Sequence, residues 1–105
     1  MAWHSYLVLF FSGMLLANGV PHFVQGASGE KFQSPFASPR GVGESSPVVN
    51  VLWGFANLAV GFVLLRSSDG LQSDATAGWL AVGAGFLAAG LYISRHFGRV
   101  RGNLS

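Results

Sequence analysis

Three long apolar segments dominate the pattern of hydrophobic and polar positions along this chain. They run from about residue 3 to 20, from 48 to 65 and from 75 to 94, and none of them contains Asp, Glu, Lys or Arg. A transmembrane helix needs roughly 17 to 25 mainly apolar residues, so each segment is long enough to cross a bilayer. The pattern therefore predicts an all-α integral membrane protein with three transmembrane helices.

The end of the first segment contains signals that stop a helix. Asn18 and Gly19 form a common C-terminal cap, and Val20 precedes Pro21, which disfavours a helical conformation of the residue before it. We therefore expect the first helix to end near Asn18, and residues 21–24 to lie in the membrane interface or re-enter it. A cleaved signal peptide is the alternative for this segment. Retention is favoured, because the start of the chain lacks the basic residues of such a peptide.

Small and polar residues recur at helical spacing in the other two segments. In the second segment, one face is predicted to combine Asn50, Gly54, Asn57 and Gly61. In the third, a stripe at every fourth position consists of Ala77, Ala81, Gly85 and Ala89. Small residues let helices approach closely in lipid, so both patterns predict helix packing, within the chain or between copies. A pore or ligand site lined by Asn57 is the alternative interpretation.

The loop between the first two segments, residues 21–47, is long and rich in Gly, Pro and Ser. It contains three Ser-Pro pairs and two phenylalanines, Phe32 and Phe36. Loops longer than about 12 to 15 residues are typically functional or disordered. Disordered linkers rarely place phenylalanines between regularly spaced prolines, so an ordered cytoplasmic loop is favoured and a flexible tether is the alternative. The last pair predicts Ser46 as the N-cap and Pro47 as the first residue of the second helix.

The basic residues predict an orientation in the membrane. With three spans, the loop lies on the same side as the tail at residues 95–105. Five of the six basic residues fall on that side: Lys31, Arg40, Arg95, Arg99 and Arg101. Cytoplasmic segments are enriched in Lys and Arg, so we expect a bacterial inner (plasma) membrane protein with its N-terminus outside and its C-terminus in the cytoplasm.

Composition supports a membrane protein and excludes several other classes. Of the 105 residues, 50% are hydrophobic and only 10% are charged, whereas soluble domains carry about 25% charged residues. The chain contains no cysteine, which excludes disulfide bridges and cysteine-ligated metals. Its formal net charge of +2 is too small for a nucleic-acid-binding surface. A single membrane domain is expected at this length.

The predicted topology brings polar residues from separate segments to one end of the bundle. Asn18, His22, Asn50 and Glu44 are the candidate ligand-binding or pore-lining residues at this end, and Asn57, near the middle of the second segment, is a further candidate. For His22 we expect a structural role, in which the imidazole satisfies the backbone carbonyls that a break at Pro21 leaves unpaired.

Two chemical roles for His22 are alternatives to this structural role. A metal site needs three or four ligands, and His22, His96 and a glutamate supply them only if the loop folds back suitably. Acid–base catalysis pairs His22 with Glu44, but no nucleophile or catalytic motif accompanies them. The sequence therefore assigns no catalytic residue, no metal ligand and no cofactor. His96, between Arg95 and Arg99, is expected to meet lipid phosphates.

The strings NGVPHFVQGASGEKF and SSPVVNVLWGFAN lie at residues 18–32 and 45–57. In these strings the chain resembles small bacterial multi-pass integral membrane proteins, a group to which no established activity is attached. The resemblance implies a membrane setting and no mechanism. The expected function is a structural or accessory subunit that self-associates or binds a larger membrane protein. The alternatives are an oligomeric channel or facilitator for a small solute and a membrane enzyme that uses His22.

Overall fold

The computed structural model describes residues 3–102, except for the side chains at positions 70 and 73. Its elements follow in the order α1 (Trp3–Ala27), β1 (Phe32–Gln33), β2 (Glu44–Ser45), α2 (Pro47–Ser67), α3 (Gly70–Ser73) and α4 (Ala75–Val100). The helices α1, α2 and α4 are each long and apolar enough to cross a membrane. The prediction of an all-helical protein with three such helices is therefore confirmed.

Helix α1 extends beyond the end that the sequence predicts. The expected boundary near Asn18 is wrong, because α1 continues through Pro21 to Ala27. The chain turns instead at Gly29, whose φ of +79° is a left-handed conformation that favours glycine. The Gly29 amide donates to a carbonyl in the last turn of α1 at 3.0 Å. The connection between α1 and α2 is therefore shorter than the predicted loop of residues 21–47.

Packing against α2 explains why α1 continues past its proline. Pro21 cannot donate a backbone hydrogen bond, but the turns on either side of it lie against α2 with no room for a side chain. A Cβ atom added to Gly19 would lie 2.8 Å from the Gly54 carbonyl oxygen, and one added to Gly26 would lie 2.5 Å from the Pro47 carbonyl oxygen. These contacts between distant parts of the sequence outweigh the local signals that stop a helix.

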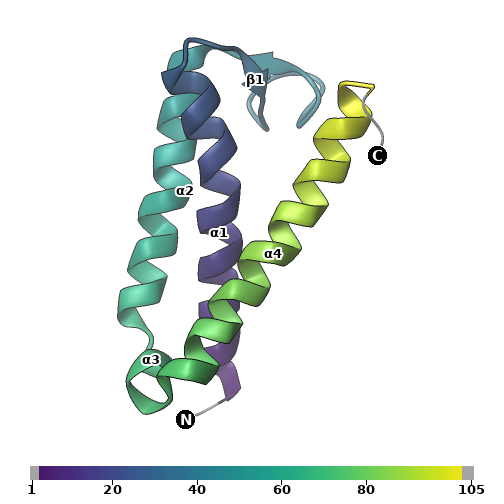
Figure 1. Cartoon of the computed structure of the whole chain (residues 1–105). Helices are drawn as coiled ribbons and strands as arrows, with labels where there is room; N and C mark the ends of the chain where they lie inside the picture. The colour runs from purple at the N-terminus through teal and green to yellow at the C-terminus, as the bar shows by residue number, and fades with distance from the viewer. Residues whose placement is uncertain (1–2, 103–105) are drawn as a thin grey trace.

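Helix α1 is the central helix of the bundle. It packs along both α2 and α4, which make few direct contacts with each other. Helix α4 crosses α1 and then diverges from it towards the end that carries the strands (Figure 1). Where α1 and α4 pack closely, Gly85 meets the Phe10 backbone and Gly13 meets the Val82 backbone.

The buried face of α2 consists of the predicted residues, whereas the buried face of α4 contains only some of them. The buried residues of α2 are the four predicted to share a face: Asn50, Gly54, Asn57 and Gly61. The buried residues of α4 are Gly78, Val82, Gly85 and Ala89. Gly85 and Ala89 of the predicted α4 stripe are thus buried, whereas Ala77 and Ala81 are only half-buried within the chain. A stripe at every fourth residue drifts around a helix of 3.6 residues per turn, so the face against α1 mixes steps of three and four.

The ends of α2 and α4 follow from their capping residues. Ser46 accepts a hydrogen bond from the Val49 amide, and Pro47 is the first helical residue, so the predicted start of α2 is confirmed. Asp74 caps α4 in the same way. Helix α4 ends at Val100, later than the expected end near residue 94, so much of the predicted basic tail is helical.

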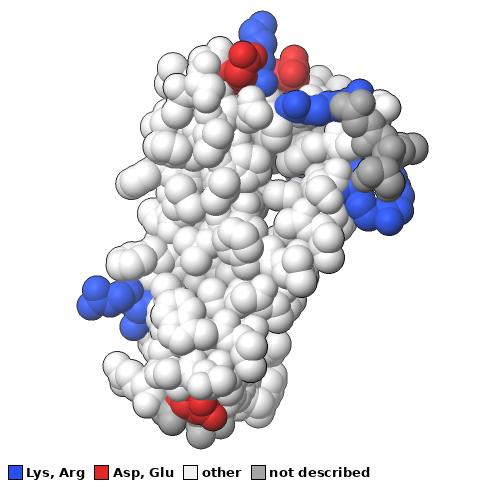
Figure 2. All heavy atoms as spheres, viewed as in Figure 1, with Lys and Arg blue, Asp and Glu red and all other residues white. Residues whose placement is uncertain are grey.

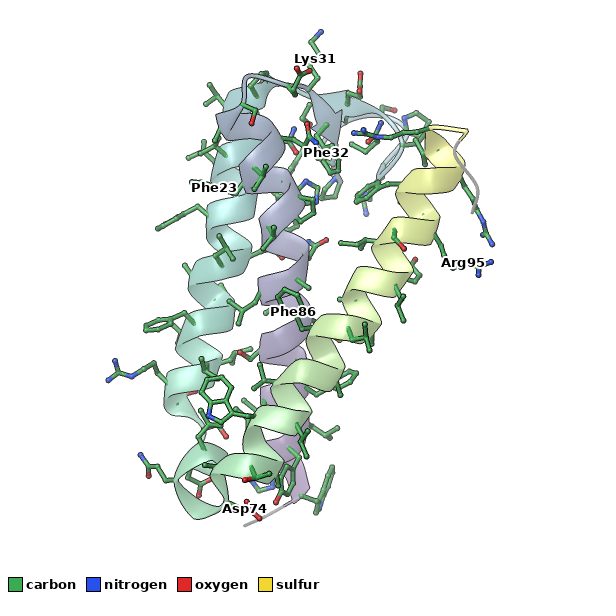
Figure 3. The ribbon with its side chains drawn as sticks, viewed as in Figure 1. Phe23, Lys31, Phe32, Asp74, Phe86 and Arg95 are labelled. Carbon is green, nitrogen blue, oxygen red and sulfur yellow. The ribbon has the colours of Figure 1, made fainter. Side chains whose placement is uncertain are left out.

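The strands β1 and β2 form a short antiparallel hairpin over one end of the bundle. Phe32 pairs with Ser45, and Gln33 pairs with Glu44. The Phe32 side chain lies over the space between the helices, whereas the neighbouring Lys31 projects away from them (Figure 3). On the face shown in Figure 2, charged side chains gather towards the two ends of the molecule, with an uncharged band between them.

Candidate functional site

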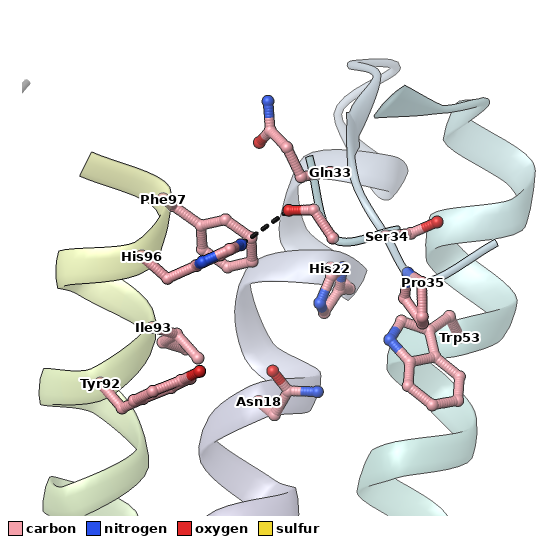
Figure 4. Close-up of a pocket in the computed structure, with 11 residues that line it drawn as sticks. Asn18, His22, Gln33, Ser34, Pro35, Trp53, Tyr92, Ile93, His96 and Phe97 are labelled. Carbon is pink, nitrogen blue, oxygen red and sulfur yellow. Dashed lines mark hydrogen bonds between the residues drawn. The ribbon is translucent and has the colours of Figure 1, made fainter. Parts of the chain in front are cut away.

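A cleft of about 300 Å³ lies where α4 diverges from α1, next to the hairpin (Figure 4). Its lining comes from the three long helices and from the loop that carries the hairpin. The lining residues are Asn18, His22, Gln33, Ser34, Pro35, Gly41, Trp53, Tyr92, Ile93, His96 and Phe97. None of them is an Asp, Glu, Lys or Arg, so the cleft offers amide, hydroxyl, indole and imidazole groups.

His22 and Asn50 form a buried polar pair at the wall of the cleft. His22 is 2% exposed and Asn50 is 0% exposed, and His22 Nδ1 lies 2.9 Å from Asn50 Oδ1. The Asn50 amide nitrogen donates towards the carbonyls of Phe32, Ser45 and Ser46 at 3.1, 3.2 and 3.1 Å. Because its nitrogen is directed at these carbonyls, Asn50 presents its oxygen to His22, and the imidazole donates from Nδ1.

This network fixes the tautomer of the neutral imidazole. With Nδ1 as the donor, Nε2 carries the lone pair and can accept a hydrogen bond. Within residues 3–102, His22 Nε2 has no hydrogen-bond partner. Asn50 therefore ties α1 and α2 to the hairpin and leaves one nitrogen of His22 as an acceptor at the cleft.

A second polar link between α1 and α2 lies one helical turn from the first along α1 and two turns from it along α2. Asn18 Nδ2 donates to Asn57 Oδ1 at 3.1 Å, and Asn57 Nδ2 donates to the Trp53 carbonyl at 2.8 Å. Both polar atoms of the Asn57 side chain are therefore hydrogen-bonded. Asn18 retains its oxygen as an acceptor, and Figure 4 shows this oxygen on the side of Tyr92.

Aromatic rings surround His22. Phe32, Trp53 and Phe97 meet its ring edge to face, with centroids 5.1, 6.4 and 6.0 Å away. Trp53 Nε1 is buried and has no hydrogen-bond partner in the part of the chain that the structure describes. In Figure 4 the indole nitrogen lies on the side of the ring that faces His22. Buried polar groups are normally paired, so this N–H is a donor whose hydrogen-bonding capacity is unused within the described residues.

Contacts with α4 hold the hairpin in place. His96 Nε2 donates to the Gly41 carbonyl at 2.7 Å, across 55 residues of sequence. Arg101 Nε donates to Gln33 Oε1 at 3.2 Å, across 68 residues. The Arg101 guanidinium also lies 4.7 Å from the centroid of the Phe32 ring, a cation–π contact. These contacts join the diverging end of α4 to the rest of the bundle.

An apolar hollow of about 400 Å³ adjoins the cleft along α1 and α4. It shares Asn18, Tyr92 and Ile93 with the cleft. Its other lining residues are Met14, Leu15, Asn57, Ala88 and Ala89. The two spaces together have a polar end next to the hairpin and an apolar end between the helices.

Four of the five candidate site residues predicted from the sequence come together in the structure. Asn18, His22, Asn50 and Asn57 form the two links described above. Glu44 does not join them, because it is exposed on β2 while the next residue, Ser45, faces inward. Neighbouring residues of a strand point to opposite faces, so only one of the two can reach the polar cluster. The placement of Glu44 in the cluster is therefore wrong.

The two histidines of this end have partners that the sequence did not predict. His22 bonds Asn50, and not carbonyls freed by Pro21, because α1 is not broken there. His96 Nε2 is directed at the Gly41 carbonyl. Among residues 3–102, no three His, Asp or Glu side chains lie close enough together to hold a metal ion. The ligand set considered for His22, His96 and a glutamate is therefore not assembled.

Sequence reasoning missed the aromatic residues of the cleft. Trp53 lies three residues after Asn50 and four before Asn57, so helical spacing alone could have placed it beside the polar cluster. Phe32 and Phe97 lie 4.8 Å apart between ring centroids. Their meeting depends on the docking of the hairpin against α4, which no local pattern indicates.

The site presents one hydrogen-bond acceptor and one donor without partners in the described chain. His22 Nε2 can accept a hydrogen bond and Trp53 Nε1 can donate one, but within the described residues no serine or threonine hydroxyl is hydrogen-bonded to His22. A nucleophile activated by His22 is therefore not formed among the described residues.

Comparison of the chain with protein-family models, with curated proteins and with solved structures finds no match.

Proposed function

We propose that this chain is an integral protein of a bacterial inner membrane and serves there as a structural or accessory subunit of a larger assembly. One observation carries the proposal: the glycines of α1 and α2 and several polar side chains of these helices face inward, while large apolar side chains cover the outer surfaces of the bundle. The buried polar residues of α1 and α2 include Ser12, Asn50 and Asn57. We expect lipid or another membrane protein to cover the apolar outer surfaces of these helices.

The outer surfaces of α2 and α4 are apolar along their length. On α2 the side chains of Leu52, Phe55 and Phe62 are more than half exposed, and on α4 the same holds for Leu80, Leu87 and Leu91. Soluble monomers rarely expose continuous apolar surface on this scale. Because the helix pair α2 and α4 makes few mutual contacts, the chain also has unused surface on which a second subunit can pack.

The distribution of charge supports an orientation with the N-terminus outside and the C-terminus in the cytoplasm. Lys31 precedes β1 and Arg40 lies in the loop between β1 and β2. Arg95 and Arg99 lie on the last turns of α4 at the same end of the bundle. Cytoplasmic segments of membrane proteins are enriched in such residues. The hairpin and the polar cleft then lie on the cytoplasmic side.

The pairing of the asparagines supports a packing role more than a solute path. Asn18 binds Asn57, and Asn50 binds His22, so these side chains link helices to one another. Further along the bundle, the Ser12 hydroxyl donates to the Gly61 carbonyl at 2.6 Å. Such hydrogen bonds join helices in lipid at a gain of about 0.6 kcal/mol each.

Reporter fusions test the membrane placement. Green fluorescent protein fused after residue 105 is expected to fluoresce, because it folds in the cytoplasm, and alkaline phosphatase at the same position is expected to be inactive. The matched pair is a fusion in the connection between α2 and α4, where the two reporters are expected to exchange their behaviour. An active phosphatase at the C-terminus would overturn the proposed orientation.

Oligomeric state in a bilayer tests the accessory role. We expect fluorescently labelled protein in vesicles to bleach in more than one step at decreasing protein-to-lipid ratios, or cross-linking in native membranes to recover a stoichiometric membrane-protein partner. A single bleaching step at every dilution, together with no stoichiometric cross-linked product, would refute the accessory role.

A further inference from the structure

We propose that the cleft and the adjoining apolar hollow bind a membrane lipid with a neutral hydroxyl head group, such as a diacylglycerol. The lipid hydroxyl lies in the cleft beside His22 and Trp53, and the hydrocarbon chain runs along the hollow between α1 and α4. The inference rests on the membrane placement proposed above and is independent of the accessory role.

The hydrogen-bonding groups of the cleft call for one ligand group that both donates and accepts. His22 Nε2 is an acceptor, because Asn50 holds the proton on Nδ1. Trp53 Nε1 is a buried donor without a partner among residues 3–102. A hydroxyl has one proton to donate and lone pairs to accept with, so it matches both groups at once. A ketone or an ether only accepts, and leaves His22 Nε2 unpaired.

The cleft gives a charged head group no partner. None of the residues that line the cleft or the hollow is an Asp, Glu, Lys or Arg, and burying an unpaired charge is costly. Arg95 and Arg99 line a neighbouring hollow of about 260 Å³, which shares Tyr92 and His96 with the cleft. A lipid phosphate would bind there, so an anionic phospholipid is the competitor that the experiment must separate from a lipid alcohol.

The apolar hollow gives a hydrocarbon chain its place. Met14 and Leu15 of α1 and Ala88 and Ala89 of α4 line it, and the two alanines leave space that larger side chains would fill. The volumes of about 300 and 400 Å³ are in the range of small-molecule sites in proteins. Because α2 and α4 make few direct contacts, a lipid can enter the hollow sideways from the bilayer.

Photolabelling of the full chain in phosphatidylcholine nanodiscs tests the proposal. The probe is a diacylglycerol with a diazirine in one acyl chain, and we expect saturable labelling of the α1 and α4 residues that line the hollow. Unlabelled diacylglycerol is expected to compete. Its methyl ether has lost the O–H that His22 Nε2 accepts, and is expected to compete about fivefold less well. Phosphatidic acid with the same chains is expected to compete more weakly than diacylglycerol.

Two substitutions separate head-group binding from chain binding. Trp53→Phe removes a donor that has no partner in the described chain, so thermal unfolding is expected to change little while the affinity for the probe falls about fivefold. Trp79→Phe, at an exposed position of α4, is the matched control. Ala88→Phe is expected to fill the hollow and abolish saturable labelling, whereas Ala84→Phe, outside both spaces, is expected to leave it unchanged.

Several outcomes would overturn the lipid-alcohol site. They are labelling that does not saturate, equal competition by diacylglycerol and its methyl ether, and undiminished labelling of Trp53→Phe. Stronger competition by phosphatidic acid that is lost in Arg95→Gln would place the ligand on the arginine-lined hollow instead, which also overturns the proposal. None of these outcomes alters the reporter fusions or the number of bleaching steps, so failure here is distinct from failure of the proposed function.

Discussion

Replacing Asn50 with alanine is expected to destabilise the protein far more than the same change at Asn57. Both asparagines are buried on the same face of α2, so the two substitutions remove equal side chains from similar surroundings. The two asparagines differ in the hydrogen bonds that their side chains make. Asn50 contacts His22 and three backbone carbonyls of the hairpin and its junction with α2, whereas Asn57 accepts one interhelical bond and donates to its own helix.

The difference in free energy follows from these contacts. The two N–H groups of Asn50 make about two hydrogen bonds to backbone carbonyls, at about 1 kcal/mol each. The Asn50→Ala change also leaves His22 Nδ1–H buried without a partner, which costs about 1 to 3 kcal/mol. We therefore expect a loss of about 4 kcal/mol in the free energy of unfolding. Asn57→Ala is expected to cost about 1 kcal/mol.

Reversible unfolding in mixed micelles of mild detergent and dodecyl sulfate measures both losses, with helix content followed by circular dichroism. A cost for Asn50→Ala that is no larger than the cost for Asn57→Ala would refute the reasoning. A double-mutant cycle isolates the buried pair: in a His22→Ala background, Asn50→Ala is expected to cost about 1 to 2 kcal/mol less than in the parent chain. A coupling near zero would mean that the two side chains do not interact.

Two further predictions concern helix packing and the hairpin. Gly85→Ala places a methyl group against the α1 backbone and is expected to destabilise the bundle by about 1 to 3 kcal/mol. The control, Gly83→Ala, places its methyl group in open space and is expected to be neutral or stabilising by up to about 1 kcal/mol in the same unfolding assay. Equal effects of the two substitutions would contradict the packing of α4 on α1. His96→Phe removes the donor to the hairpin loop and is expected to raise amide hydrogen exchange at residues 34–43 severalfold, measured by mass spectrometry. Arg99→Gln, exposed on the same helix, is the control, and unchanged exchange in His96→Phe would show that this bond does not hold the loop.

The helices and one packing face could be predicted from the sequence because both depend on local patterns. The apolar segments are long, and the spacing of Asn50, Gly54, Asn57 and Gly61 repeats with the period of a helix. The true end of α1 could not be predicted in the same way. The local signals at Gly19 and Pro21 stop a helix, and they are outweighed by contacts with α2, whose register against α1 is not visible in the sequence.

The candidate site could be predicted only where it lies on helices. Asn18 and Asn50 occupy predicted helical positions at the same end and His22 follows closely after Asn18, so topology brings these three together, and helical spacing places Asn57 on the same face as Asn50. The positions of the aromatic rings around His22 and the exposure of Glu44 depend on how the hairpin folds. Hydrogen bonds to Gly41 and Gln33 from residues 55 and 68 positions later in the chain hold the hairpin and its loop. Contacts over that distance leave no periodic signal in the chain.

The central place of α1 has a consequence for how the protein is made. Helix α1 precedes α2 in the chain and carries Ser12, Asn18 and His22, whose hydrogen-bond partners lie 49, 39 and 28 residues downstream. Until α2 is synthesised, these polar groups have no partner in the lipid, where an unsatisfied group costs several kcal/mol. The cost of these unpaired groups therefore favours entry of α1 and α2 into the lipid as a pair, so that each polar side chain of α1 meets its partner on insertion.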